Sequence, residues 1–221
     1  MISKGTLRFT SLTAIILIIV ALTVYLFASK GQIEQMRVII DTAELRNGDL
    51  LFRNGNGVES RFVTRVGGGE YSHIAMAYRN ENGWMAVHAV PGETENAGDT
   101  DFLKIESIKD FYKPDRARSG AIARVNCSGH QAEASLKYAI DKAEQKFEFD
   151  HKYELADSSK FYCTELIYRA FLTQGIDLAD NRRHELPMPG TEGYFIFPSD
   201  ILSSQYIQYV KVLKSELFIN P

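Results

Sequence analysis

Hydrophobic positions divide the chain into a long uncharged run near its start and a series of short apolar segments after residue 45. Residues 12–28 contain no charged side chain, and counting from Phe9 extends this stretch to 20 residues. Such a length is enough to cross a hydrocarbon core of about 30 Å. We therefore predict a membrane anchor or signal segment over residues 1–30, with residues 9–28 in contact with the membrane.

The composition of this segment favours an uncleaved anchor over a cleaved signal peptide. Signal peptides have apolar regions of about 7–15 residues and a small side chain three positions before the cut. Here Leu26 occupies that place for a cut after Ala28. Lys4 and Arg8 precede the run and are expected to stay in the cytoplasm, so the folded domain is expected on the outer side. Two basic residues just after the run partly offset this bias, and a cytoplasmic domain remains the alternative.

After a juxtamembrane connector at residues 31–44, the pattern predicts one folded domain over residues 45–221. Asn82-Gly83 between two apolar runs predicts a β-hairpin. Ser128 and Gln131 have the spacing of a capping box at a helix start. The expected strands are 49–52, 71–78, 84–90, 120–125 and 206–213, the expected helices are 58–66, 128–146 and 161–174, and 180–198 is expected as a long ordered loop. Because these elements show no βαβ rhythm, we predict the α+β class.

One of the two cysteines, Cys163, lies near the start of the predicted helix 161–174. It shares the apolar face of that helix, while Glu165 and Arg169 are expected on the opposite face at a favourable i,i+4 spacing. A helix N-terminus and an imidazolium partner together can lower a thiol pKa by about 2 units, which makes thiolate the main form at neutral pH. The position therefore favours a nucleophile. A buried apolar filler and a disulfide with Cys127 remain alternatives.

Two histidines lie on the predicted hairpin, and the register of the hairpin decides whether they meet. With a loop at 80–83, paired residue numbers sum to 163, so Ala75 faces His88. His73 is then a diagonal neighbour on the same face, roughly 7–8 Å away by backbone. The small residues beside His73 leave room for the helix that carries Cys163. In thiol hydrolysis one imidazole takes the thiol proton and a second polar group fixes its tautomer, which suggests His73 as base and His88 as orienting residue.

Other interpretations of the same residues stay open. His73 and His88 can be unrelated core histidines, or a zinc ion can bind both together with Cys163, although this set lacks a compact ligand spacing. We find no sign of a cofactor in the sequence. The formal net charge is −3, and the absence of a basic stripe argues against nucleic acid as a partner.

Four segments in order, NGDLLF, YSHIAMAY, AVHAVPG and FYCTELIYRAF, resemble the YaeF/YiiX group of circularly permuted NlpC/papain-like proteins. The resemblance covers residues 45–202. It implies an antiparallel half-barrel with the cysteine helix packed against it, Cys163 as nucleophile and His73 as base. His88 matches the third, polar position, where members of the group can carry glutamate.

We expect the oxyanion hole at the start of the cysteine helix, where the backbone N–H of Cys163 is a natural donor and the Tyr162 hydroxyl a candidate second one. Together these features predict a membrane-anchored thiol hydrolase that cleaves an amide, in a cell-envelope peptide, through an acyl-enzyme. A lipid acyl hydrolase or acyltransferase that uses the same cysteine is the first alternative, because related permuted folds include such enzymes. A non-catalytic envelope binding module is the second. The sequence leaves the oligomeric state open.

Overall fold

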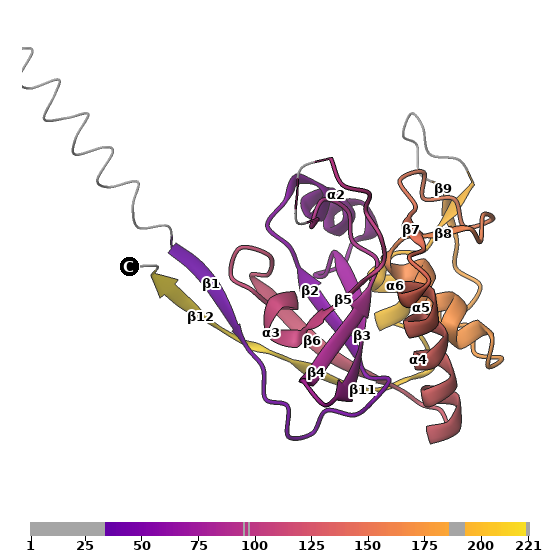
Figure 1. Ribbon diagram of the computed structural model, residues 1–221, viewed down its shortest axis with the longest axis horizontal. Coiled ribbons are helices and arrows are strands. Elements are labelled where there is room, and N and C mark those ends of the chain that lie inside the picture. Colours follow the sequence, from indigo (N-terminus) through magenta and orange to yellow (C-terminus); the bar gives the residue numbers. More distant parts are fainter. Residues whose placement is uncertain (1–33, 95, 97, 186–192, 220–221) are drawn as a thin grey trace, which may run out of the picture. The chain divides into compact units, whose positions relative to one another are not determined.

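The computed structural model describes residues 34–94, 96, 98–185 and 193–219 (Figure 1). The predicted anchor at residues 9–28 lies outside these residues. Within the described part of the chain, no helix has the length and apolar character needed to span a membrane. Contacts divide the chain into two units, Met36–Glu216 and the chain ends Met1–Gln35 with Leu217–Pro221. The candidate site lies within the first unit.

A six-stranded antiparallel sheet forms the centre of the unit Met36–Glu216. Its strands, in spatial order, are β11 (Ile207–Val212), β6 (Ser119–Val125), β2 (Leu50–Asn54), β3 (His73–Asn80), β4 (Gly83–His88) and β5 (Lys104–Ser107). The helices are α2 (Val58–Gly67), α3 (Ile108–Phe111), α4 (Gly129–Glu144), α5 (Cys163–Leu172) and α6 (Pro198–Leu202). The mixture of helices with an antiparallel sheet confirms the α+β prediction.

Three short two-stranded pairs accompany the main sheet. They are β1 (Glu34–Ile39) with β12 (Lys214–Ile219), β7 (Glu148–Phe149) with β8 (Lys160–Phe161), and β9 (His184–Glu185) with β10 (Tyr194–Phe195). The first pair changes the expected domain boundary. Residues 31–44 were predicted to be a connector, but they contain β1, and Val38 is buried against the sheet. The compact unit therefore begins near Met36 rather than at residue 45.

The register of the β3–β4 hairpin is the predicted one. Met76 pairs with Val87, and the series runs to Asn80 opposite Gly83, so each pair of residue numbers sums to 163. Gly83 has φ 108°, a conformation that glycine adopts without strain. An Asn-Gly turn thus fixes which residues share a face, and it places His73 and His88 on the same one.

The two faces of the sheet are covered by different elements, and here one expectation was wrong. Helices α4 and α5 pack on the face that carries Ile74 and Met76 (Figure 1). The small residues next to His73, Ala75 and Ala77, belong to the opposite face, where they pack with Phe111 of α3. The alanines therefore make room for an aromatic ring, while the cysteine helix uses the face with the larger side chains.

Most of the remaining predicted elements match the structure. Helix α4 has Ser128 as its N-cap, with the expected capping box to Gln131. Helices α2 and α5 match their predicted helices within two residues, and β11 matches the last predicted strand within one. Strand β5 and helix α3 were not expected, because residues 104–111 contain no run of alternating apolar residues. The expected loop at 180–198 includes β9, β10 and the first residue of α6, and its residues 186–192 lie outside the described part.

Candidate active site

Three adjacent strands hold a line of hydrogen-bonded side chains. His73 begins β3, His88 ends β4 and Glu106 lies on β5. His73 Nε2 is 2.8 Å from His88 Nδ1, and His88 Nε2 is 3.1 Å from Glu106 Oε1. All three side chains are buried. We call this arrangement the histidine relay.

Two cations contact Glu106, the carboxylate at one end of the histidine relay. Lys104 Nζ lies 3.1 Å and Arg116 Nη1 lies 2.7 Å from Glu106 Oε2. Burial raises the pKa of Glu106, but the hydrogen bond and charge of His88 and the charge of Lys104 outweigh it and lower the pKa to about 2. Burial also lowers the pKa of His88, although Glu106 opposes that shift. The state that follows is an ionised carboxylate beside a neutral imidazole.

The ionised Glu106 sets the direction of the hydrogen bonds in the histidine relay, and this direction determines which nitrogen of His73 can act as a base. A carboxylate only accepts hydrogen bonds, so His88 Nε2 must carry a hydrogen and donate it to Glu106. His88 Nδ1 is then unprotonated and accepts from His73 Nε2–H. The remaining nitrogen, His73 Nδ1, therefore has a free lone pair. The hydrogen-bond network thus determines both tautomers.

Burial also keeps His73 neutral. It lowers the pKa of His73 well below its ordinary value, and the nearby charge of Arg53 acts in the same direction. Arg53 is the direct cross-strand partner of His73 in the β2–β3 pairing. Its guanidinium is buried, donates to the carbonyl of Phe111 at 2.8 Å and forms an ion pair with Glu93. A neutral imidazole at pH 7 is competent to accept a proton.

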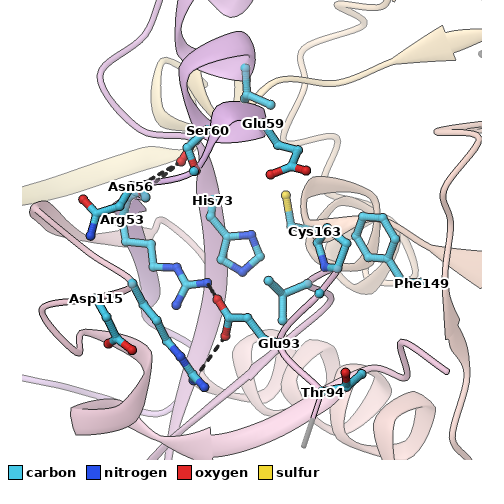
Figure 2. Close-up of a pocket in the computed structure, with 18 of the residues that line it drawn as sticks. Arg53, Asn56, Glu59, Ser60, His73, Glu93, Thr94, Asp115, Phe149 and Cys163 are labelled. Atoms are coloured by element: carbon cyan, nitrogen blue, oxygen red, sulfur yellow. Dashed lines mark hydrogen bonds and ion pairs between the residues drawn. The ribbon is translucent and has the colours of Figure 1, made fainter. Parts of the chain in front are cut away.

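Cys163 and His73 line the same cavity, which has a volume of about 400 Å³. Figure 2 shows the sulfur and the ring beside one opening, between Glu59 above and Glu93 below. Cys163 is the first residue of α5 and is partly exposed to this cavity, whereas His88 lies behind His73 and is fully buried. Within the described part of the chain, no other side chain forms a hydrogen bond with the Cys163 thiol. The structure thus brings both predicted reacting groups to one cavity.

The protonation state of Cys163 differs from the expectation. We predicted that the helix N-terminus and an imidazolium would lower its pKa. Instead, burial raises the pKa to about 11, although the backbone N–H groups of Ile74, Thr164 and Cys163 itself oppose the rise. Because His73 is neutral as well, the resting pair is a thiol and an imidazole. Loss of solvation outweighs the dipole of the helix at this depth.

The other predicted features of the cysteine helix have mixed outcomes. Cys127 and Cys163 are both free thiols, so the alternative of a disulfide does not apply. Glu165 and Arg169 form the predicted pair at 2.6 Å, but Glu165 is buried rather than exposed, and burial raises its pKa to about 8. Tyr162 lies in the core, where its hydroxyl accepts a hydrogen bond from the Ile196 N–H and its ring stacks on a neighbouring aromatic ring. It does not line the cavity, so this structure assigns it to packing rather than to the oxyanion hole.

Five charged residues around the histidine relay were not predicted from the sequence: Arg53, Glu93, Lys104, Glu106 and Arg116. The sequence offers one weak indication of Glu106, namely that polar residues occupy every second position of β5. Zinc was an alternative for His73, His88 and Cys163. Both nitrogens of His88 are engaged in the relay, and no group of three or more potential metal ligands occurs among the described residues.

An antiparallel sheet that carries an imidazole, packed against a helix that begins with a thiol, defines a papain-like fold. Residues 44–184 match the model of a family described as permuted papain-like amidase enzymes, YaeF/YiiX, C92 family. The chain belongs to this family, as the four sequence segments predicted, and the family supports a hydrolase.

A solved structure agrees with this assignment. The crystal structure of the metalloprotein YiiX from Escherichia coli O157:H7 is similar to this chain, with a TM-score of 0.60 and 14% sequence identity over 77% of this chain and 97% of that one. At this identity the likeness shows the fold alone. No curated protein matches the chain.

Proposed function

We propose that this protein is a thiol-dependent hydrolase that cleaves an amide bond in a cell-envelope peptide. Cys163 is the nucleophile, His73 the general base and His88 the orienting residue. The observation that carries the proposal is the histidine relay, because its polarity leaves His73 Nδ1 without a hydrogen beside the cavity that Cys163 also lines. An amidase family adds support for the reaction class.

The proposed reaction begins with proton transfer. His73 Nδ1 takes the proton of the Cys163 thiol while Sγ forms a bond to the carbonyl carbon of the substrate. The backbone N–H of Cys163, at the first position of α5, lacks an acceptor within the helix and can stabilise the oxyanion. The imidazolium then gives its proton to the amide nitrogen, the C–N bond breaks and the amine leaves. A thioester to Cys163 remains.

The second half of the proposed reaction uses the same groups in reverse. His73 Nδ1 takes a proton from water, whose oxygen attacks the thioester carbon. The C–S bond breaks, the sulfur recovers the proton, and a carboxylic acid leaves. In both halves the ionised Glu106, acting through His88, stabilises the positive charge that His73 carries transiently. Since the resting thiol is protonated, the thiolate forms only as the substrate is attacked.

Location supplies the proposed substrate class. The run at residues 9–28 has the length of a membrane anchor, and the basic residues before it favour a domain on the outer side of the membrane. A hydrolase held there would meet peptides of the cell envelope. The similar YiiX protein is described as a metalloprotein. The proposed reaction of this chain needs no metal, because thiol, imidazole and backbone N–H groups perform each step.

The test is a comparison of the parent chain with Cys163→Ala on amide and lipid ester substrates. We expect the variant to lose at least about 10³-fold of the hydrolysis rate. Its melting temperature should stay within about 2 °C, because a partly exposed thiol leaves little cavity. In the parent chain, intact mass should show an acyl adduct on Cys163. Undiminished amide hydrolysis by the variant would refute the proposal, and an adduct formed from lipid alone would favour the acyl hydrolase or acyltransferase alternative.

A further inference from the structure

Helix α2 (Val58–Gly67) turns its apolar side away from the rest of the protein. None of its residues is buried, and Val58, Phe62 and Val66 are 71%, 36% and 46% exposed. Since they are spaced four residues apart, these three side chains lie along one side of the helix. We call them the α2 stripe. In a surface helix of an ordinary domain such a stripe faces the core.

The opposite side of α2 is fixed in place by close packing. Gly67 lies so near the ring of Phe197 that a Cβ at this position would be 2.6 Å from Cδ1. The Gly67 carbonyl accepts a hydrogen bond of 2.7 Å from the Ser199 hydroxyl, and Val63 packs against the main core. The helix cannot turn its stripe inward without losing these contacts. The exposure of the stripe is therefore a property of the fold.

Two cations accompany the α2 stripe. Arg61 and Arg65 follow Val58 by three and seven residues, so both lie along one edge of the stripe. Arg61 donates to the carbonyl of Asn56 at 3.2 Å, and neither guanidinium forms an ion pair with a carboxylate in the described part of the chain. Glu59, the acidic residue of the helix, lines the cavity instead. An apolar stripe with basic residues beside it is typical of helices that lie in the interface of an anionic membrane.

The size of the stripe favours lipid over protein as its partner. A stable protein interface buries about 800 Å² on each partner, which three side chains cannot provide. The chain also has a second segment suited to a bilayer. Seven residues, 29–35, separate the apolar run 9–28 from the compact unit that begins at Met36. Fully extended, they reach no further than about 25 Å, so an inserted run would keep the unit close to the lipid surface.

We propose that α2 docks on an anionic phospholipid surface. Val58, Phe62 and Val66 enter the boundary of the acyl chains, and Arg61 and Arg65 meet the phosphate groups. Because the other side of α2 lines the cavity that Cys163 and His73 share, docking places this cavity at the surface of the bilayer. The proposal concerns binding and stands whether or not the proposed reaction is correct.

The experiment measures how deeply α2 enters the lipid bilayer, and it uses the full chain. Phe62→Trp is mixed with vesicles of phosphatidylglycerol and phosphatidylcholine that carry brominated acyl chains, which quench tryptophan on contact. The parent chain supplies the background from Trp84, and Val210→Trp on β11 is the matched control, since Val210 is also an exposed apolar residue. Val66→Trp repeats the measurement if the first variant is unstable. We expect strong quenching at position 62 or 66 and none above background at position 210.

Charge gives the second arm of the experiment. Each arginine near an anionic surface contributes roughly a fivefold change in affinity. Arg61→Gln combined with Arg65→Gln should therefore lower the equilibrium constant for docking of α2, read from the quenching at position 62, about 25-fold, and added salt should act in the same direction. Three results would overturn the proposal: vesicle-bound protein without quenching at 62 and 66, equal quenching in neutral vesicles that the arginine variants do not change, or self-association that shields residue 62.

Discussion

The two halves of the candidate site differ in how they are held. The histidine half consists of three buried side chains on adjacent strands, joined by hydrogen bonds of 2.8 and 3.1 Å and closed by two cations. The cysteine half is a single thiol at the start of α5, partly open to the cavity and without a side-chain partner among the described residues. The histidine half is therefore held in place by its own hydrogen bonds, whereas the cysteine half is a protonated thiol that no other side chain in the described ranges holds in place.

The difference has a physical origin in burial. The same loss of solvent that keeps His73 neutral, and so able to accept a proton, also keeps the thiol protonated. In the proposed reaction, activation of the thiol therefore comes from proton transfer to His73 when a substrate fills the cavity. In that proposal, the hydrogen bonds of the relay keep a free lone pair on His73 Nδ1 for this transfer. Three predictions test this comparison.

The largest effect is expected from removing the base. His73→Ala should lower kcat/KM about 10²–10⁴-fold, because a positioned general base contributes that much to proton transfer. His130→Ala, at an exposed position on α4, is the matched control and should leave the rate unchanged. Steady-state kinetics on the amide substrate measure both. If the two variants hydrolyse at similar rates, the relay has no part in the reaction.

A smaller loss is expected from Glu106→Gln, a change that keeps the shape of the side chain. Lys104 and Arg116 will attract the amide oxygen, so the amide NH₂ will face His88 and reverse the direction of the hydrogen bonds. His73 Nδ1 then carries a hydrogen and cannot act as a base. We expect kcat/KM to fall on the order of 10²-fold.

Nitrogen NMR of His73 separates this positioning effect from simple damage to the fold. It should show the hydrogen on Nε2 in the parent chain and on Nδ1 in Glu106→Gln. An unchanged tautomer together with an unchanged rate would show that the polarity of the relay is not set by Glu106.

The smallest effect is expected on the rate at which the Cys163 thiol is alkylated in the absence of substrate. With its pKa raised to about 11, Cys163 is protonated through the neutral range, and the thiolate fraction grows as the pH rises. Iodoacetamide should therefore alkylate it roughly 10²-fold more slowly at pH 7 than a free thiol of pKa about 8.5, with a rate that increases steadily toward alkaline pH. Mass spectrometry of Cys163→Ala gives the contribution of Cys127. Rapid labelling near pH 6 would instead mean a thiolate at rest, and both halves would be organised in advance.

The sequence predicted those parts of the site that local rules determine. The Asn-Gly turn fixes the hairpin register, and the register brings His73 and His88 together. The capping box and the apolar face likewise predicted α4 and α5. Glu106 was missed because β5 is short, and because its role depends on two cations and an imidazole that only the folded sheet brings together. The predicted shift of the Cys163 pKa was wrong in direction, since the burial of the thiol cannot be inferred from the position of Cys163 in its helix.

The order of the site residues along the chain has a consequence for biosynthesis. His73, His88 and Glu106 lie on consecutive strands of one meander, so their contacts are short in sequence. Contacts of this kind form early in folding. Cys163 leaves the ribosome later and joins them only when α5 closes over the sheet. Under the proposed function, a nascent chain that ends before residue 163 lacks the nucleophile, so we expect hydrolysis to begin only after α5 has been made and packed on the sheet.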